Sequence, residues 1–156
     1  MRILGIDPGT ATTGFGLIEE AAGQLRMIDA GVISTKPDTP MPDRLATIYD
    51  ELTQLISELK PTAVAVEKLY FNTNVTTGIQ VGQARGIVLL AASKAALPLF
   101  EYTPLQVKMA ITGYGRASKA QMQDMVKMLL KLTDIPKPDD AADGLAIAIT
   151  NAKSLK

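Results

Sequence analysis

The sequence predicts an α/β fold, in which helices flank a mixed five-stranded sheet. The 156 residues are enough for one globular domain, and 47% apolar and 21% charged side chains are ordinary for a domain with a buried core. Three apolar runs follow closely on one another at the start of the chain, and later apolar runs alternate with segments of helical spacing. We therefore expect a single domain over residues 1–156, in the order β-β-β-α-β-α-β with further helices after the last strand.

The first half of the chain is expected to form three strands and one helix. Arg2–Asp7 is an apolar run that ends in an acid before a Pro-Gly turn, which is typical of a buried strand. Thr12–Glu20 and Gln24–Ser34 follow with only a short turn between them, which indicates an antiparallel meander. After a loop with three prolines, Leu45–Leu59 has apolar residues at helical spacing and ends before Pro61.

The second half is expected to alternate strands with helices. Thr62–Glu67 is a β-branched apolar run that again ends in an acid, so we expect a buried strand there. Thr76–Ala96 is expected to form a long helix. Leu97–Glu101 is a short strand, which Pro98 places near an edge or at its own start. Three more helices are expected at Pro104–Ile111, from the Ser118 cap to Leu132, and from the end of the Asp134–Asp139 loop to about Ala152.

The residue types that the chain lacks exclude several kinds of active site. The chain has no Cys and no His, which excludes disulfides, a thiolate nucleophile, a Ser-His-Asp triad and a zinc site with Cys or His ligands. Asp7 interrupts the first apolar run too early for a signal peptide, and the longest later run, Ile87–Ala92, is too short to span a membrane. We therefore expect a soluble, cytoplasmic protein without membrane association, whose catalysis would use carboxylates, hydroxyls, Lys, Arg, backbone amides or a metal held by oxygen.

Four acids lie where apolar residues would be expected. Asp7 and Glu67 end two strands that the pattern predicts to be fully buried, and they would lie side by side if those strands are adjacent and parallel. Asp140 and Asp143 are three residues apart, so they share one face at the start of an otherwise apolar helix. Asp139 is better explained as the residue that caps this helix.

Any one of these acids is more simply explained as a turn or capping residue, but their combination favours a functional site. Clustered carboxylates repel one another and raise each other's pKa unless a cation neutralises them. Because no His or Cys is available, the cation would be Mg²⁺ or Mn²⁺. Two such ions about 4 Å apart activate a water molecule and stabilise a leaving oxygen in phosphodiester hydrolysis.

Four segments resemble the motifs of the RuvC family of bacterial Holliday-junction resolvases, which are crossover junction endodeoxyribonucleases. They are ILGIDPGTATTGFGLI, AVEKLYF, GQARGIVLLAA and DAADGLAIAIT, in the order and spacing of the family. The resemblance implies a ribonuclease-H-like fold and a homodimer that binds four-way DNA junctions and makes symmetric paired nicks, using Mg²⁺, in homologous recombination and DNA repair. It also implies the branch-migration complex of RuvA with RuvB as a partner.

The resemblance assigns roles to individual acids. The family's catalytic and metal-binding acids correspond to Asp7, Glu67, Asp140 and Asp143. Asp140 rather than Asp139 takes the third place, because the motif is an acid, two small residues and another acid. The family usually has Ala where Gly144 stands, and glycine weakens a helix by up to about 1 kcal/mol.

The net charge of zero does not exclude a DNA partner, because the charge is uneven along the chain. Residues 1–78 contain 6 basic and 10 acidic side chains, whereas residues 79–156 contain 10 basic and 6 acidic ones. A basic stretch of this kind suits contacts with phosphates. Lys127 and Lys131 are four residues apart and are better explained as a solvated helix face.

Four residues are candidates for DNA contacts. Lys108 and Lys119 match positions that the family uses near phosphates, and Arg116 lies in a Gly-flanked loop. Tyr70 follows Glu67 by three residues in an expected loop, and the family has an aromatic residue at this position. An exposed aromatic there would stack on an unpaired base at the junction centre, which contributes about 1–3 kcal/mol per base. Packing beneath the loop explains Tyr70 equally well.

The sequence leaves three alternatives open. Gly78, Gly82 and Gly86 recur every fourth residue on the long helix, and this stripe would serve either packing on the sheet or a dimer interface. The segment from Asp7 to Thr10 resembles the first phosphate loop of the actin and sugar-kinase ATPases, which however build their nucleotide cleft between two domains. A binding module without catalytic activity is the third alternative, and the presence of all four acids argues against it.

Overall fold

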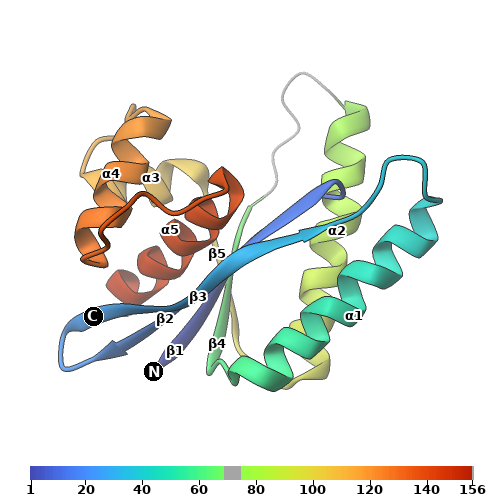
Figure 1. Ribbon diagram of the computed structural model, residues 1–156, viewed down its shortest axis with the longest axis horizontal. Coiled ribbons are helices and arrows are strands. Elements are labelled where there is room, and N and C mark those ends of the chain that lie inside the picture. The colour runs from blue at the N-terminus through green and yellow to red at the C-terminus, as the bar shows by residue number, and fades with distance from the viewer. Residues whose placement is uncertain (69–74, 156) are drawn as a thin grey trace.

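The computed structural model describes residues 1–68 and 75–155 (Figure 1). Within these residues the strands are β1 (Arg2–Asp7), β2 (Thr12–Ala21), β3 (Gln24–Ser34), β4 (Ala63–Glu67) and β5 (Leu99–Tyr102). The helices are α1 (Met41–Leu59), α2 (Val75–Lys94), α3 (Pro104–Thr112), α4 (Lys119–Leu129) and α5 (Asp139–Ser154). The expected fold class and the order of the elements are confirmed.

The sheet has the strand order β3-β2-β1-β4-β5. β1 pairs antiparallel with β2 and parallel with β4, and β4 pairs parallel with β5. In the β1–β4 ladder Ile6 lies opposite Val66, so the residues that follow them, Asp7 and Glu67, reach the same edge of the sheet. β1 and β4 are therefore adjacent and parallel, which is the arrangement that puts Asp7 and Glu67 side by side.

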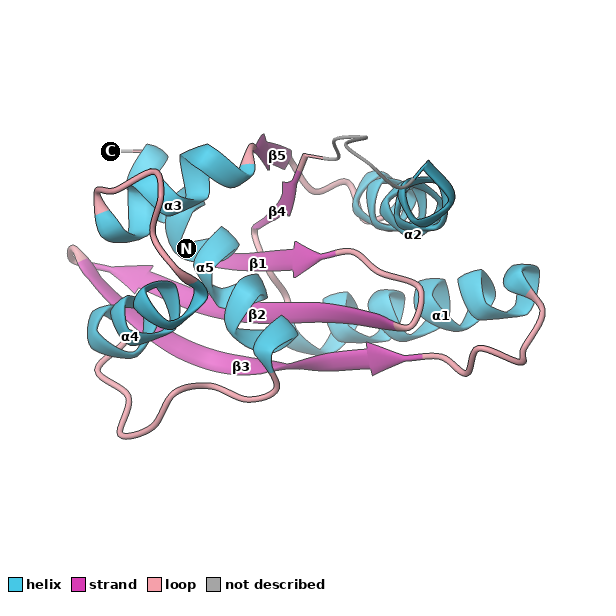
Figure 2. Cartoon of the chain, turned by 90° about the horizontal axis from the view of Figure 1, so that it is seen from above, coloured by secondary structure: helices cyan, strands magenta, loops and turns pink. Residues whose placement is uncertain are grey.

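Helices cover both faces of the sheet (Figure 1, Figure 2). α1 and α2 lie on one face, where Leu4 and Val66 share a buried cluster with Ile48 of α1 and Val88 of α2. α3, α4 and α5 lie on the other face, where Ile3 shares a second cluster with residues of all three helices. Since successive strand residues point to opposite faces, β1 and β4 are buried on both faces, as their continuous apolar runs predict.

Helix α5 lies against β1 and β2 almost backbone to backbone. A methyl group at Gly14 would overlap the backbone carbonyl of Asp140, and one at Gly144 would lie 2.6 Å from the carbonyl carbon of Phe15. Both contacts therefore require glycine, so Gly144 allows α5 to approach β2, which helix propensity alone does not predict. Because Gly14 lies opposite Asp7 in the β1–β2 ladder, this approach brings the first turn of α5 to the end of β1.

Two element boundaries differ from the prediction by more than two residues. α1 begins at Met41 rather than Leu45, because Pro42 lies in its first turn, where the missing N–H costs no hydrogen bond. α4 ends at Leu129 rather than Leu132, and Lys131 has a left-handed φ of 54° just beyond it. Among the described helices, none has both the length and the apolar character that crossing a membrane requires.

Candidate active site

Three of the predicted acids meet at the end of β1. Asp7 is the last residue of this strand, and Asp140 and Asp143 lie near the start of α5. One carboxylate oxygen from each of the three lies within 4.8 Å of the others. The close backbone contact at Gly14 creates this group, because it holds the start of α5 against the strand end.

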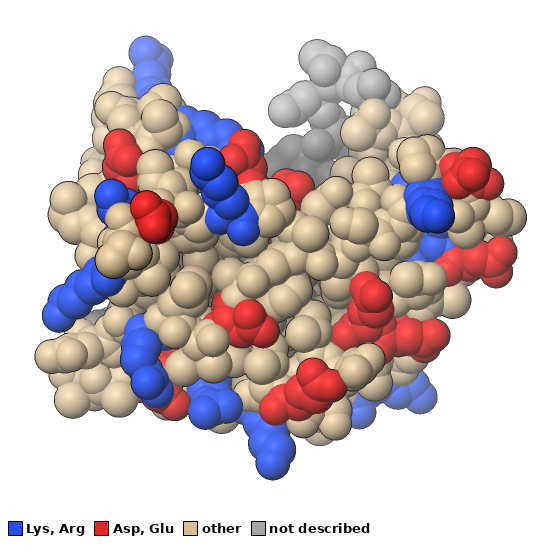
Figure 3. Space-filling model, in the orientation of Figure 1, with Lys and Arg blue, Asp and Glu red and all other residues tan. Residues whose placement is uncertain are grey.

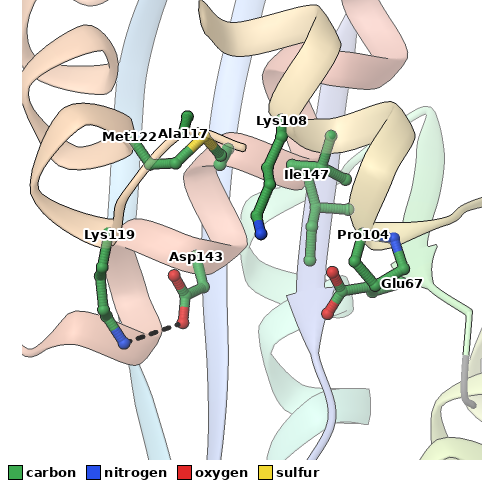
Figure 4. Close-up of a pocket in the computed structure, with 10 residues that line it drawn as sticks. Glu67, Pro104, Lys108, Ala117, Lys119, Met122, Asp143 and Ile147 are labelled. Atoms are coloured by element: carbon green, nitrogen blue, oxygen red, sulfur yellow. Dashed lines mark ion pairs between the residues drawn. The ribbon is translucent and has the colours of Figure 1, made fainter. Parts of the chain in front are cut away.

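Glu67 faces Asp143, one member of this group, across a pocket (Figure 4). The pocket has a volume of about 270 Å³, and both Glu67 and Asp143 line it. Among the described residues, Asp7, Asp140 and Asp143 form the group whose oxygens lie within 4.8 Å of one another, and Glu67 is not a member of it. Apolar side chains such as Val107, Met122 and Ile147 line much of the remaining wall. The four acids are therefore arranged as a close group of three with the fourth opposite.

Burial and mutual repulsion oppose ionisation of these carboxyl groups. Burial, followed by the charges of Asp143, Glu67 and Asp140, raises the pKa of Asp7 to about 8. Burial is also the largest cause that raises the pKa of Glu67 and that of Asp143. A cation among the carboxylates would reverse these shifts, because it favours their charged forms.

Two lysines bring positive charge to the acids. Lys119 Nζ, at the start of α4, lies 3.5 Å from Asp139 Oδ2 and 3.8 Å from Asp143 Oδ2. The charge of Asp143 is the largest cause that raises the pKa of Lys119. Lys108 of α3 lines the pocket (Figure 4), and its charge opposes the upward shift in the pKa of Glu67. The structure therefore brings both predicted lysines to the rim of the acidic site.

Arg116 is not among the described residues that line the pocket. Arg116 is exposed in the loop between α3 and α4, and Tyr70 lies outside the described residues. Asp139 is in the first turn of α5, where it accepts a hydrogen bond from Gln123, but the residue that caps the helix is Pro138. The expectation that Asp139 caps α5 is therefore wrong.

The glycine stripe on α2 is divided between two environments. Gly78 is buried, whereas Gly86 is exposed and has no described neighbour within 4 Å of the position its Cβ would take. Large apolar side chains on the same helix are exposed as well, namely Val75, Ile79 and Leu90. Part of α2 therefore faces away from the described fold with an apolar surface.

Two arginines that the sequence pattern did not indicate hold the edge of the site. Arg44 of α1 is buried, and its Nε donates to Thr35 Oγ1 at 2.8 Å, while that hydroxyl donates to the carbonyl of Thr10 in the β1–β2 loop. Arg85 of α2 donates through Nε to the backbone carbonyl of Glu67 at 3.3 Å. A basic residue on the inward face of a packed helix is the sequence signal that would have indicated them.

The donor set fits a hard divalent cation. Carboxylate oxygens are the ligands that Mg²⁺ and Mn²⁺ prefer, and three of them lie within 4.8 Å of one another. Lysines beside carboxylates would also attract a phosphate to the same pocket. Hydrolysis of a phosphodiester is the reaction that this combination suits.

Comparison of the sequence with known proteins gives full-length matches. The family model for crossover junction endodeoxyribonuclease RuvC matches residues 3–151. The RuvC crossover junction endodeoxyribonuclease of Desulfitobacterium hafniense is 58% identical over 155 residues, which are 99% of this chain and 94% of that relative. The RuvC of Rubrobacter xylanophilus is 59% identical over 152 residues, which are 97% of this chain and 85% of the relative.

Comparison of the structure leads to the same group of proteins. T. thermophilus RuvC, solved in complex with a Holliday junction substrate, has a TM-score of 0.94 at 36% identity, over 99% of this chain and 94% of that one. The yeast mitochondrial Holliday junction resolvase has a TM-score of 0.68 at 17% identity over 95% of this chain and 76% of its own, which supports the fold alone. The ribonuclease-H-like fold that the sequence resemblance implies agrees with both structures.

Proposed function

Because the chain belongs to the RuvC family of crossover junction endodeoxyribonucleases, we propose that it resolves four-way DNA junctions by symmetric paired nicks in homologous recombination and DNA repair. It is an endodeoxyribonuclease of the metal-dependent kind. The observation that carries the proposal is the close group formed by Asp7, Asp140 and Asp143, on a chain that matches the family almost from end to end.

The four acids are the proposed catalytic and metal-holding residues. Asp7, Asp140 and Asp143 would bind the cation directly, and Glu67 would contribute from across the pocket. We propose Mg²⁺ as the ion, with Mn²⁺ as an alternative, and two ions per site during catalysis. When bound, such ions activate water and stabilise the leaving oxygen. The proton that Asp7 keeps at neutral pH must leave before its carboxylate can act as a ligand.

The basic residues around the pocket are proposed to bind and orient DNA. Lys108 extends into the pocket toward the acids (Figure 4), where its ammonium group would contact a phosphate of the strand to be cut. Lys119 is paired with acids of α5 and would turn to a phosphate once a cation neutralises them. Arg116 and Tyr70 are proposed as further contacts, with a phosphate and with an unpaired base at the junction centre.

We also propose that the protein acts as a homodimer, because two symmetric nicks require two sites. Val75, Ile79 and Leu90 form an exposed apolar stripe on α2, with 61%, 52% and 45% of their surfaces accessible. Their spacing puts all three on one side of the helix, and such stripes mark protein contacts. The RuvA–RuvB branch-migration complex as a partner and a cytoplasmic location complete the proposal.

A cleavage assay with Mg²⁺ tests this function. The wild-type protein is expected to make paired nicks in a four-way junction and to spare linear duplex DNA. Asp7→Asn and Asp140→Asn are expected to abolish cutting and to keep junction affinity. Asp139→Asn is the matched control: this side chain is 63% exposed and is not one of the three close acids, so cutting should persist. Equal cutting of linear duplex, or full activity of Asp7→Asn, would contradict the proposal.

A further inference from the structure

The backbone carbonyl of Glu67 is at a point where the sheet cannot supply a donor. The amide of Val64 in β4 donates at 2.9 Å to the carbonyl of Pro98, which precedes β5, and the amide of Lys68, which follows β4, donates at 2.7 Å to the carbonyl of Tyr102 in β5. The polar groups of the alternate residue Glu67 therefore point toward β1. Ile6 opposite Val66 is the last pair of the β1–β4 ladder. One more step in this register would bring the nitrogen of Pro8 to the Glu67 carbonyl, and proline has no N–H.

Arg85 of α2 supplies the missing donor. Its Nε donates to the Glu67 carbonyl at 3.3 Å, and its Nη2 lies 3.0 Å from Glu101 Oε2 on β5. Only 17% of the arginine side chain is exposed. One guanidinium therefore joins the end of β4 to β5 and to the helix that covers them, in the fork geometry that arginine allows.

The guanidinium approaches from the face opposite the acidic site. Val66 is packed in the cluster that contains residues of α2, so the next side chain, that of Glu67, points to the other face, where it shares a pocket with Asp143. Arg85 therefore touches the backbone of Glu67 and leaves its carboxylate free to face the pocket. The orientation of that carboxylate depends on the peptide unit that Arg85 holds.

We propose that Arg85 is a positioning residue for Glu67, which fixes the last peptide unit of β4 and thereby sets the carboxylate opposite the other three acids. The inference rests on the proposed metal-holding role of Glu67. Glu101 assists by holding the guanidinium from β5. Replacement of such a supporting residue typically weakens metal binding or activity by about 10–100-fold.

Arg2 provides a matched control for a purely structural effect. It also pairs with a glutamate, at 3.3 Å from Glu19 Oε1, and donates to a backbone carbonyl, that of Leu59, at 2.9 Å. It begins β1, whereas Asp7 ends that strand, so its contacts lie at the opposite edge of the sheet. Arg2→Gln therefore removes the same kinds of bond without touching the site.

The test compares Arg85→Gln, Arg85→Lys, Arg2→Gln and Glu67→Gln as full-length proteins. Calorimetric titration with Mn²⁺ gives metal affinity, and amide hydrogen exchange in the metal-free protein reports on the end of β4. Arg85→Gln is expected to lower Mn²⁺ affinity by about tenfold, to speed exchange at residues 67 and 68, and to leave junction affinity unchanged. Arg85→Lys should fall between wild type and Arg85→Gln, because an ammonium cannot bridge both acceptors. Arg2→Gln should leave Mn²⁺ affinity unchanged.

The outcomes separate this inference from the proposed function. Weaker Mn²⁺ binding in Glu67→Gln but not in Arg85→Gln would overturn the role of Arg85 and leave that of Glu67 standing. Normal Mn²⁺ binding in both variants would overturn both. An equal loss in Arg2→Gln and Arg85→Gln would identify a general stability effect and would also overturn the inference.

Discussion

A carboxylate oxygen of Asp7, at the end of β1, lies within 4.8 Å of one of Asp143, on α5, in the site where a cation is expected. Burial and the neighbouring acids raise the pKa of Asp7 to about 8, so this residue keeps its proton at neutral pH in the metal-free protein. Ionisation of these acids therefore destabilises the folded protein when no metal is bound in the proposed site.

The stability of the metal-free protein is expected to fall as pH rises from about 4 to about 8. Asp7 ionises at an ordinary pKa of 3.8 in the unfolded chain but at about 8 in the folded one, so the folded state gives up its proton only at the upper end of this range and loses stability across it. Asp7→Asn should exceed wild type at pH 8 by about 1 kcal/mol or more in free energy of unfolding, and converge with it near pH 4. Urea unfolding with a chelator measures both, and equal stabilities at pH 8 would contradict the expectation.

The sequence predicted those parts of the fold and site that depend on periodicity within one element. Arg2–Asp7 and Gln24–Ser34 have the predicted bounds, because apolar runs between turns define a strand locally. The two strand-end acids and the pair on α5 could be found in the same way. The contact of Gly144 with β2 and the reach of Arg85 to Glu67 could not, because each depends on which elements become neighbours.

Gly144→Ala should have two opposing effects on the free energy of unfolding. Helix propensity alone predicts a gain of up to about 1 kcal/mol in stability. The added methyl group would however lie 2.6 Å from the backbone of Phe15, and overpacking of this kind costs about 1–3 kcal/mol. We expect a net loss in the free energy of unfolding, together with slower cleavage because α5 carries Asp140 and Asp143. A stabilised variant would show that α5 can shift away from β2 without cost.

Lys108 and Lys119 are expected to contribute to junction affinity through phosphates. Replacing either by Gln should reduce the slope of log affinity against log salt concentration by about one, because one phosphate contact is lost. Lys131→Gln is the control, since this exposed lysine lines a pocket with Gly23 of the β2–β3 turn and Leu25 of β3, at the other end of the sheet. Fluorescence anisotropy with a labelled junction, over a series of salt concentrations, measures the slopes. An unchanged slope in Lys108→Gln would exclude a phosphate contact there.

Ile79→Glu is expected to weaken the proposed homodimer. Ile79 is 52% exposed and lies between Val75 and Leu90 on the apolar stripe of α2, so a buried carboxylate in the middle of the interface would have no partner. A loss of about 1.4 kcal/mol is a tenfold change in the dimer dissociation constant, and a central interface residue is expected to exceed it. Met128→Glu is the control, because Met128 is 67% exposed on α4 and outside the stripe. Sedimentation of both variants measures the constant, and Ile79→Glu should also replace paired nicks by single ones. If Ile79→Glu has the same dimer dissociation constant as the wild type, this surface of α2 is not the interface.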